Sequence, residues 1–161
     1  MLILRRAAAG DELAVATVHV RSWQAAYADL LPADGLAALS PQDRARRYTF
    51  DAVPTVIAEA NGTIRGFVTY GERDGRAMIW ALYVDPGHWD EGLGARLLNC
   101  ALADLAGQGR RTVDLWVLQG NTRAERFYLR HGLRPTGRTR RETLFGAEVE
   151  EFELRAETAS S

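Results

Sequence analysis

The chain of 161 residues has the length of one domain, and its composition, 47% hydrophobic and 25% charged, is that of a globular protein, which excludes a disordered, collagen-like or coiled-coil chain. Twenty basic and 21 acidic residues give a formal net charge of -1, so no overall field draws the chain to nucleic acid or to a membrane surface. All 20 Lys and Arg positions are arginine, which excludes a Schiff-base lysine, a lysine general base and the phosphate-binding lysine of a P-loop.

The first elements combine one strand with two helices. Residues 2–6 read as a short strand, and Asp11 offers a helix cap ahead of apolar residues that recur at helical spacing to about Tyr27. Ser40 then provides a capping hydroxyl followed directly by proline, and we expect a second helix over residues 41–50.

From residue 54 the apolar pattern changes to that of strands. Residues 55–60 and 64–70 flank an Asn-Gly pair suited to a tight hairpin turn, and an Asp-Gly pair at 74–75 gives a second hairpin signal. Residues 77–84 follow as a nearly continuous apolar run, as expected of a central strand buried on both faces.

A helix with leucines at helical spacing over residues 93–105 separates this strand from another apolar strand at 112–118. Such a strand–helix–strand crossover requires the two strands to be parallel. Residues 121–131 predict a further helix, and residues 133–155 read as two strands joined around Phe145-Gly146. The sequence thus predicts an α/β (α+β) fold with a mixed, mostly antiparallel twisted sheet, a central parallel strand pair and the element order βααβββαβαββ.

We expect one domain over residues 1–161, with residues 156–161 as a flexible tail. The single cysteine, Cys100, lies in an apolar stretch and is expected to pack rather than to act as a nucleophile. The chain shows neither a signal-peptide pattern nor a long apolar run, so we expect a cytoplasmic protein without a membrane partner. We expect no metal site.

A glycine-rich loop lies where crossover sheets bind their ligands. The run Glu91-Gly92-Leu93-Gly94-Ala95 opens the helix that follows the central strand, so several amides can point at one anion, helped by the helix dipole. Two glycines before a helix are also common in simple turns. Phosphate binding at this loop is therefore a hypothesis.

Four runs of residues within 77–134 carry a further pattern: Ala81-Leu-Tyr-Val-Asp-Pro86, Gly92-Leu-Gly-Ala-Arg-Leu-Leu98, Leu115-Trp-Val-Leu-Gln-Gly-Asn121 and Ala124-Glu-Arg-Phe-Tyr-Leu-Arg-His-Gly132. Together they resemble the core motifs of the GCN5-related N-acetyltransferase (GNAT) family, and residues 23–32 are similar to the first helix and loop of many members. The resemblance implies a GNAT-like fold and an enzyme that moves an acetyl group from acetyl-CoA to an amine of a small molecule or peptide, by direct attack in a ternary complex.

The resemblance also implies where the co-substrate binds. In the family motif Q/R-x-x-G-x-G/A, Gly92 and Gly94 take the glycine positions, whereas Trp89 stands where glutamine or arginine is expected. The amides of residues 90–95 would hold the pyrophosphate, and backbone groups where the central strands splay would pair with pantetheine as an added strand would. The full set is Leu82, Tyr83, Val84, Trp89, Asp90, Glu91, Gly92, Leu93, Gly94, Ala95 and Asn121. Asn121 is expected either to contact the cofactor or to cap the following helix, and the two roles are compatible.

Tyr128 corresponds to the family tyrosine that protonates the coenzyme A sulfur, and we expect it to be the general acid; without the resemblance it reads as a core aromatic residue. The general base stays unassigned, because residues 77–84 contain no carboxylate, and Glu72, Asp74, His88 or a water chain are the candidates. A strand amide near Leu82 or Tyr83 would stabilise the oxyanion.

Asp90 and Glu91 depart from the family pattern, because a carboxylate in this loop would repel a pyrophosphate. At 4 Å, two unit charges repel by about 1 kcal/mol in water and about 4 kcal/mol at an effective dielectric of 20. Acids at a helix start also interact favourably with the helix dipole, and we expect both side chains to point away from the phosphates.

Alternatives remain open for the partner and the activity. Nine arginines in residues 110–141 could suit nucleic acid, but without interleaved aromatic residues they favour solvated faces and contact with coenzyme phosphates, so we expect no nucleic-acid partner. The acidic loop keeps a non-catalytic acyl-CoA-binding module as a second hypothesis, and a homodimer stays open. The sequence does not specify the acceptor. Candidates for lining its pocket are Trp23, Tyr27 and Tyr48, which equally suit the core. Candidates for attracting a cationic acceptor are Glu148, Glu150 and Glu151.

Overall fold

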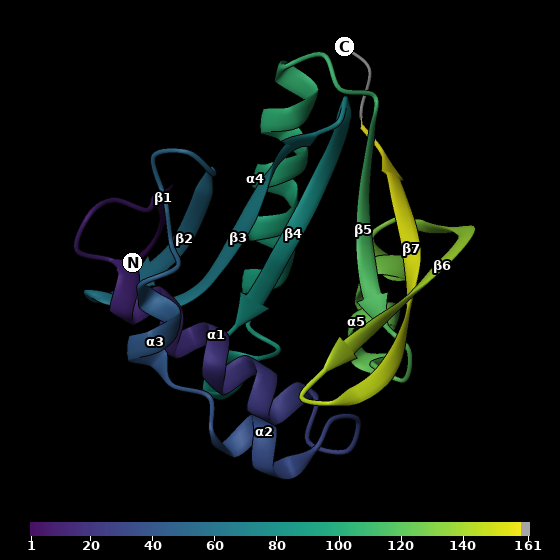
Figure 1. The fold of residues 1–161 in the computed structure, drawn as a ribbon. Helices are drawn as coiled ribbons and strands as arrows, with labels where there is room; N and C mark the ends of the chain where they lie inside the picture. Colours follow the sequence, from purple (N-terminus) through teal and green to yellow (C-terminus); the bar gives the residue numbers. More distant parts are fainter. Residues whose placement is uncertain (159–161) are drawn as a thin grey trace.

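The structure, a computed structural model, describes residues 1–158 and contains a seven-stranded sheet in the order β1-β2-β3-β4-β5-β7-β6. Neighbouring strands are antiparallel except β4 and β5, which run parallel (Figure 1). The elements in chain order are β1 (Leu2–Arg6), α1 (Glu12–Ala26), α2 (Ala33–Ala37), α3 (Pro41–Ala45), β2 (Thr55–Ala60), β3 (Thr63–Arg73), β4 (Arg76–Val84), the 3-10 turn η1 (Pro86–His88), α4 (Leu93–Gly107), β5 (Thr112–Leu118), α5 (Thr122–Arg130), β6 (Arg134–Leu144) and β7 (Ala147–Glu157). The predicted mixed sheet with a central parallel pair is confirmed.

The three hairpins form because each turn offers two residues that accept positive φ. Asn61, Asp74 and Phe145 have φ of 53°, 54° and 51°, and the glycine after each has φ near 79°. Such paired positive angles match the twist of the flanking strands in a two-residue turn. The two predicted Asn-Gly and Asp-Gly turns, and the joint at residues 145–146, are therefore confirmed.

A β-bulge opens the sheet between β4 and β5. The register of β3 against β4 shifts between residues 69 and 70, which leaves Trp80 as an extra residue in β4. A bulge bends its strand and increases the local twist. Within the described chain, β4 and β5 are in register at a single pair, Met78 with Asp114, and beyond it the two strands diverge (Figure 1). The backbone at the end of β4 therefore faces an opening instead of a neighbouring strand.

Helices cover the two faces of the sheet. α4 packs on one face, where Leu97, Leu98 and Leu105 join the main core of β2–β5, and α1 crosses the other face with Val15 and Val18 in a second cluster (Figure 1). No helix within residues 1–158 is long and apolar enough to cross a membrane.

The helical region before β2 differs from the prediction. The helix expected over residues 41–50 starts at its predicted serine cap but ends at Ala45, and an unpredicted short helix, α2, precedes it. Beyond Ala45, the hydroxyl of Tyr48 lies 3.1 Å from Nδ1 of His19, and Phe50 enters the cluster under α1. These long-range contacts outweigh continuation of the helix, in a stretch whose aromatic residues have only modest helix propensity.

The C-terminal strand is longer than predicted. Residue 156 was expected to begin a tail, but Ala156 and Glu157 pair with Val113 and Thr112 in β7. Ala156 is buried, so its side chain contributes to the core that holds the strand end in place. The rest of the predicted tail, residues 159–161, lies outside the described residues.

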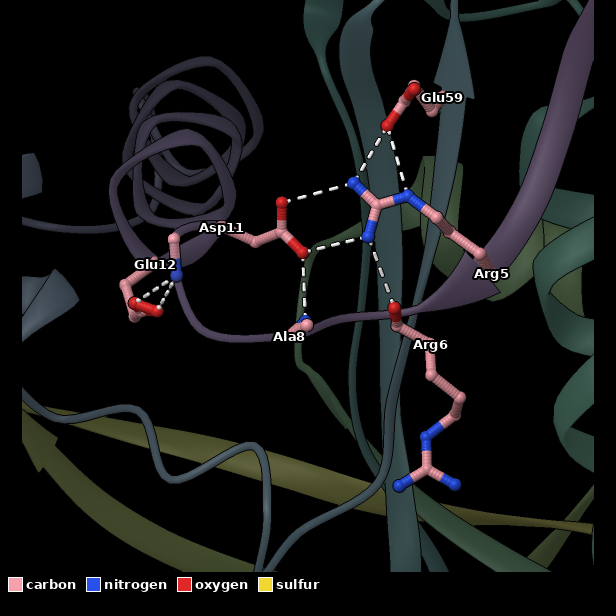
Figure 2. Close-up of polar contacts among 7 residues, drawn as sticks. Arg5, Arg6, Ala8, Asp11, Glu12 and Glu59 are labelled. Atoms are coloured by element: carbon pink, nitrogen blue, oxygen red, sulfur yellow. Dashed lines mark hydrogen bonds and ion pairs between the residues drawn. The ribbon is translucent and has the colours of Figure 1, made fainter.

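A charged cluster fixes β1 against the start of α1, as Figure 2 shows. Asp11 occupies the N-cap position but makes no side-chain cap; instead it accepts hydrogen bonds from the amide of Ala8 at 2.8 Å and from Arg5 at 2.9 Å. Arg5 also donates to Glu59 of β2 at 2.8 Å. The guanidinium of Arg5 holds the pKa of Asp11 below its usual value. The predicted capping role of Asp11 is therefore wrong, because the carboxylate is drawn to the nearby arginine.

Candidate functional site

A cavity of about 760 Å³ lies in the opening between β4 and β5. Its walls come from β4, β5, the loop and first turn of α4, α5, and the end of α1. The predicted site residues other than Glu91 line it: Leu82, Tyr83, Val84, Trp89, Asp90, Gly92, Leu93, Gly94, Ala95, Asn121 and Tyr128. Leu82 and Tyr128, 46 positions apart in the chain, thus line the same cavity between the diverging strands.

The first turn of α4 suits an anion. Gly92 has φ of 79°, and no side chain caps the first turn of the helix. The backbone amides of this 15-residue helix start are therefore free to bind a negative group, which the helix dipole also attracts. Gly94 has a second role, because a Cβ at this position would lie 3.2 Å from Cζ of Phe127 in α5. Its absence lets α4 and α5 approach closely at the cavity.

The two loop acids are directed at cations. Asp90 lies 3.0 Å from a guanidinium nitrogen of Arg123, and its side chain is 85% exposed. Glu91 lies 3.0 Å from Nδ1 of His88 and 3.5 Å from Arg65, and it does not line the cavity. The expectation that the acids point away from the amide cradle agrees with these contacts, and the part expected of the Glu91 backbone amide in binding the pyrophosphate stays a prediction. The pairing of the Glu91 side chain with Arg65 and His88 explains its direction.

Trp89 anchors the loop to the end of β4. Its Nε1 donates a hydrogen bond of 2.9 Å to the carbonyl of Val84, and Oγ of Ser22 donates another of 3.0 Å to the same oxygen. The guanidinium of Arg123 lies 4.2 Å from the Trp89 ring centroid. Because a carbonyl has two lone pairs, the Val84 oxygen is already saturated. The prediction that the backbone of Val84 pairs with pantetheine therefore rests on its N–H group.

The direction of the backbone in β4 decides which groups face the opening. The amide of Asp85 donates to the carbonyl of Arg65 at 2.7 Å, toward β3. In an antiparallel pair, alternate residues point their backbone groups to opposite sides. The backbone groups of Tyr83 therefore point to β3, and those of Leu82 point to the cavity. Of the two strand amides considered for the oxyanion, that of Leu82 is the one that faces the cavity.

Three tyrosines from different elements line the cavity: Tyr27 of α1, Tyr83 of β4 and Tyr128 of α5. Burial raises the pKa of each, and the neighbouring Tyr83 hydroxyl raises those of Tyr27 and Tyr128 further. Within the described chain, burial and the nearby Tyr83 hydroxyl set the direction of the Tyr128 pKa shift, with no hydrogen bond among its causes, and the residue is only 8% exposed. A neutral hydroxyl at the cavity wall can donate a proton or a hydrogen bond to a ligand.

The other expected residues divide between the site and the scaffold. Among the candidate bases, His88 lines the cavity, whereas Glu72 pairs with Arg110 and Asp74 forms the β3–β4 turn at the opposite end of β4. Asn121 does cap α5, accepting a hydrogen bond of 3.3 Å from Ala124. Trp23 packs edge-on against Tyr27, outside the cavity lining.

Some site residues carry no signal in the amino-acid sequence. Ser22 and the bulge at Trp80 depend on contacts between distant elements, and no local pattern marks them. Arg123, Arg126 and Arg130 also line the cavity, and here a signal existed, because their spacing puts them on adjacent turns of α5.

The fold and this site define a class of α/β proteins in which a splayed strand pair and a helix start share one cavity. The model of the acetyltransferase (GNAT) family matches residues 19–133. The chain therefore belongs to the GNAT family, whose acyl donor is acetyl-CoA.

Relatives and structures agree with this assignment. The chain is similar to a mycothiol acetyltransferase of Clavibacter sepedonicus, 37% identical over 93 residues that cover 57% of this chain and 31% of that protein. It is 26% identical over 128 residues to the N-acetyltransferase YuaI of Bacillus subtilis, covering 75% of this chain and 74% of that protein. The structure of PaiA N-acetyltransferase from Thermoplasma acidophilum, in complex with coenzyme A, shares the fold with a TM-score of 0.80, at 18% identity and covering 98% and 99% of the two chains. The chain thus spans about a third of the mycothiol enzyme's length.

Proposed function

We propose that this protein is an N-acetyltransferase that moves the acetyl group of acetyl-CoA to an amine by direct attack in a ternary complex. One observation carries the proposal: the bulge at Trp80 opens β4 and β5 beside an uncapped helix start, with Tyr128 on the same cavity. The opening offers strand groups for a long chain, and the helix start offers amides for its phosphates.

The donor would be held mainly by backbone groups. The pyrophosphate would lie at the first turn of α4, where amides are free and both loop acids are paired with arginines. The pantetheine arm would extend along β4 and pair with the backbone of Leu82 and the amide of Val84. Acetyl-CoA supplies an activated carbonyl and a thiolate leaving group.

The acid role falls to Tyr128. Burial raises its pKa, so the hydroxyl stays protonated at neutral pH and can give its proton to the departing sulfur. The amide of Leu82 would donate a hydrogen bond to the carbonyl oxygen as charge develops there. Attack by the amine needs no covalent enzyme intermediate, and Cys100 packs beside the main core, away from the cavity lining.

The acceptor would approach from the face of the sheet that α1 covers. There Ser22, Tyr27, Trp80 and Trp116 contribute to the cavity wall, opposite the helix start that would hold the donor. The amine would meet the thioester where the strands diverge. Its proton would leave through water in the cavity.

An acceptor screen tests the proposal. The protein is mixed with acetyl-CoA and a panel of small primary amines and peptides with free amino termini, and free thiol and the acetyl mass gain are both measured. Thiol release matched by an acetylated amine is the expected result. Tight acetyl-CoA binding without release on any amine favours a non-catalytic acyl-CoA-binding module. Absence of acetyl-CoA binding by calorimetry rejects both functions.

A further inference from the structure

Helix α5 presents arginines along one side of the cavity. Arg126 and Arg130 line the main cavity and also an adjoining hollow of about 550 Å³, which Leu129 and Arg134 complete. The two hollows therefore form one continuous surface, running from the start of α4 past the outer face of α5.

Arg126 and Arg130 differ from the other arginines of this region. Arg123 is engaged by Asp90 and by the Trp89 ring, and Arg134 donates to the carbonyls of Leu129 and Leu133 at 3.1 and 2.8 Å. Within residues 1–158, no carboxylate lies in ion-pair distance of Arg126 or Arg130, and both are exposed. Like charges four residues apart on a helix repel each other, and an anion bound between them would relieve that repulsion.

These arginines and the start of α4 line one cavity, so a single ligand with two phosphate groups can contact both. Residues 92–95 and both arginines line the same cavity. In coenzyme A, the ribose that carries the pyrophosphate also carries a 3′-phosphate, a few bonds farther along. With the pyrophosphate on α4, the arginines of α5 are cationic groups of the same cavity that this dianion could reach. Guanidinium groups bind phosphate oxygens in a bidentate manner, which a water-exposed ammonium group does not match.

We propose that Arg126 and Arg130 bind the 3′-phosphate of coenzyme A and make this protein select coenzyme A over its 3′-dephospho form. This inference rests on the proposed function, because it takes acetyl-CoA as the donor. It adds a second anion site to the helix start. The acceptor face and the thioester chemistry do not depend on it.

Calorimetry with coenzyme A and with 3′-dephospho-coenzyme A tests the inference without any turnover. We expect the wild-type protein to bind coenzyme A at least tenfold more tightly, and the preference to shrink as salt is added, since both partners are charged and exposed. In the variant Arg126→Gln/Arg130→Gln the ratio of the two dissociation constants should fall to about one, with the affinity for the dephospho form unchanged.

A matched control removes two arginines elsewhere. Arg6 and Arg47 are exposed and lie outside both hollows, so Arg6→Gln/Arg47→Gln lowers the net charge equally and should keep the wild-type ratio. Equal affinity of the wild-type protein for the two ligands overturns the inference and leaves the proposed function intact. A ratio that falls as far in the control as in the α5 variant also overturns it, because net charge would then suffice. Failure to bind either ligand contradicts the proposed function itself.

Discussion

Replacing Tyr128 with phenylalanine removes a single oxygen from the cavity wall. The ring can keep its place, because it packs against the main core and meets Phe127 edge-on with 5.2 Å between centroids. No hydrogen bond is among the causes of the Tyr128 pKa shift within the described chain, so we expect loss of the hydroxyl to leave no partner group unpaired. We therefore expect the free energy of unfolding to change by less than about 0.5–1 kcal/mol.

The effect on turnover should be much larger than the effect on stability. General acid catalysis is typically worth about 10²- to 10⁴-fold, or about 2.7–5.4 kcal/mol of barrier. The predicted result is that kcat for acetyl transfer falls by this factor while the dissociation constant of acetyl-CoA stays within about twofold. Urea unfolding, calorimetry and a thiol-release assay measure the three quantities on one protein preparation.

The pH dependence of Tyr128 gives a second readout. Burial raises its pKa above the ordinary value of 10.0, so the folded state holds this proton more tightly than the unfolded state does. Its contribution to stability is present below about pH 10 and declines as the pH rises through the folded-state pKa.

Full turnover in Tyr128→Phe would refute the acid role, and a loss of turnover with an equal loss of acetyl-CoA affinity would show that the residue only shapes the pocket.

Three further changes test other parts of the structure. Burial lowers the pKa of His19 to about 3 from 6.5, so the wild type should lose stability as the pH falls from about 6.5 toward 3; urea titrations should show a flatter profile for His19→Gln, and an equally steep one would locate the effect elsewhere. Ser22→Ala and Trp89→Phe should each cost about 0.5–1.5 kcal/mol, and the double variant about 1 kcal/mol more than their sum, because the Val84 carbonyl then loses both donors; strict additivity in chemical unfolding would contradict this. Gly92→Ala should cost about 1–2 kcal/mol, since φ is 79°, and an unchanged melting temperature would mean that the loop relaxes freely.

The paired acids of the α4 loop show how a local departure from a family motif is tolerated. Asp90 and Glu91 would oppose a pyrophosphate if they faced the helix start. Arg123 comes from α5 and Arg65 from β3, and each draws one carboxylate away. Because these arginines lie 33 and 26 residues from their partners, the compensation becomes visible only when the chain is folded.

Local patterns were sufficient for most elements. The hairpins at residues 61–62 and 74–75, the crossover helix and the parallel partner strand follow from turn chemistry, apolar periodicity and the rule for strand crossovers, and all are confirmed. The predicted end of helix α3 and the predicted end of strand β7 were wrong, because contacts of Tyr48 and Ala156 with distant residues set those boundaries. The cytoplasmic location and a homodimer stay predictions.

The amino-acid sequence by itself determined the order of the elements, the glycines that free the start of α4 and the family motifs, because each of these depends on residues close together in the chain. The tertiary structure alone decided that β4 bulges at Trp80, that Ser22 and Trp89 saturate one carbonyl, and that Tyr128 reaches the resulting opening. The physical reason is that hydrogen-bond register and ion pairing between separate elements depend on how the whole sheet twists, and no short window of sequence contains that information.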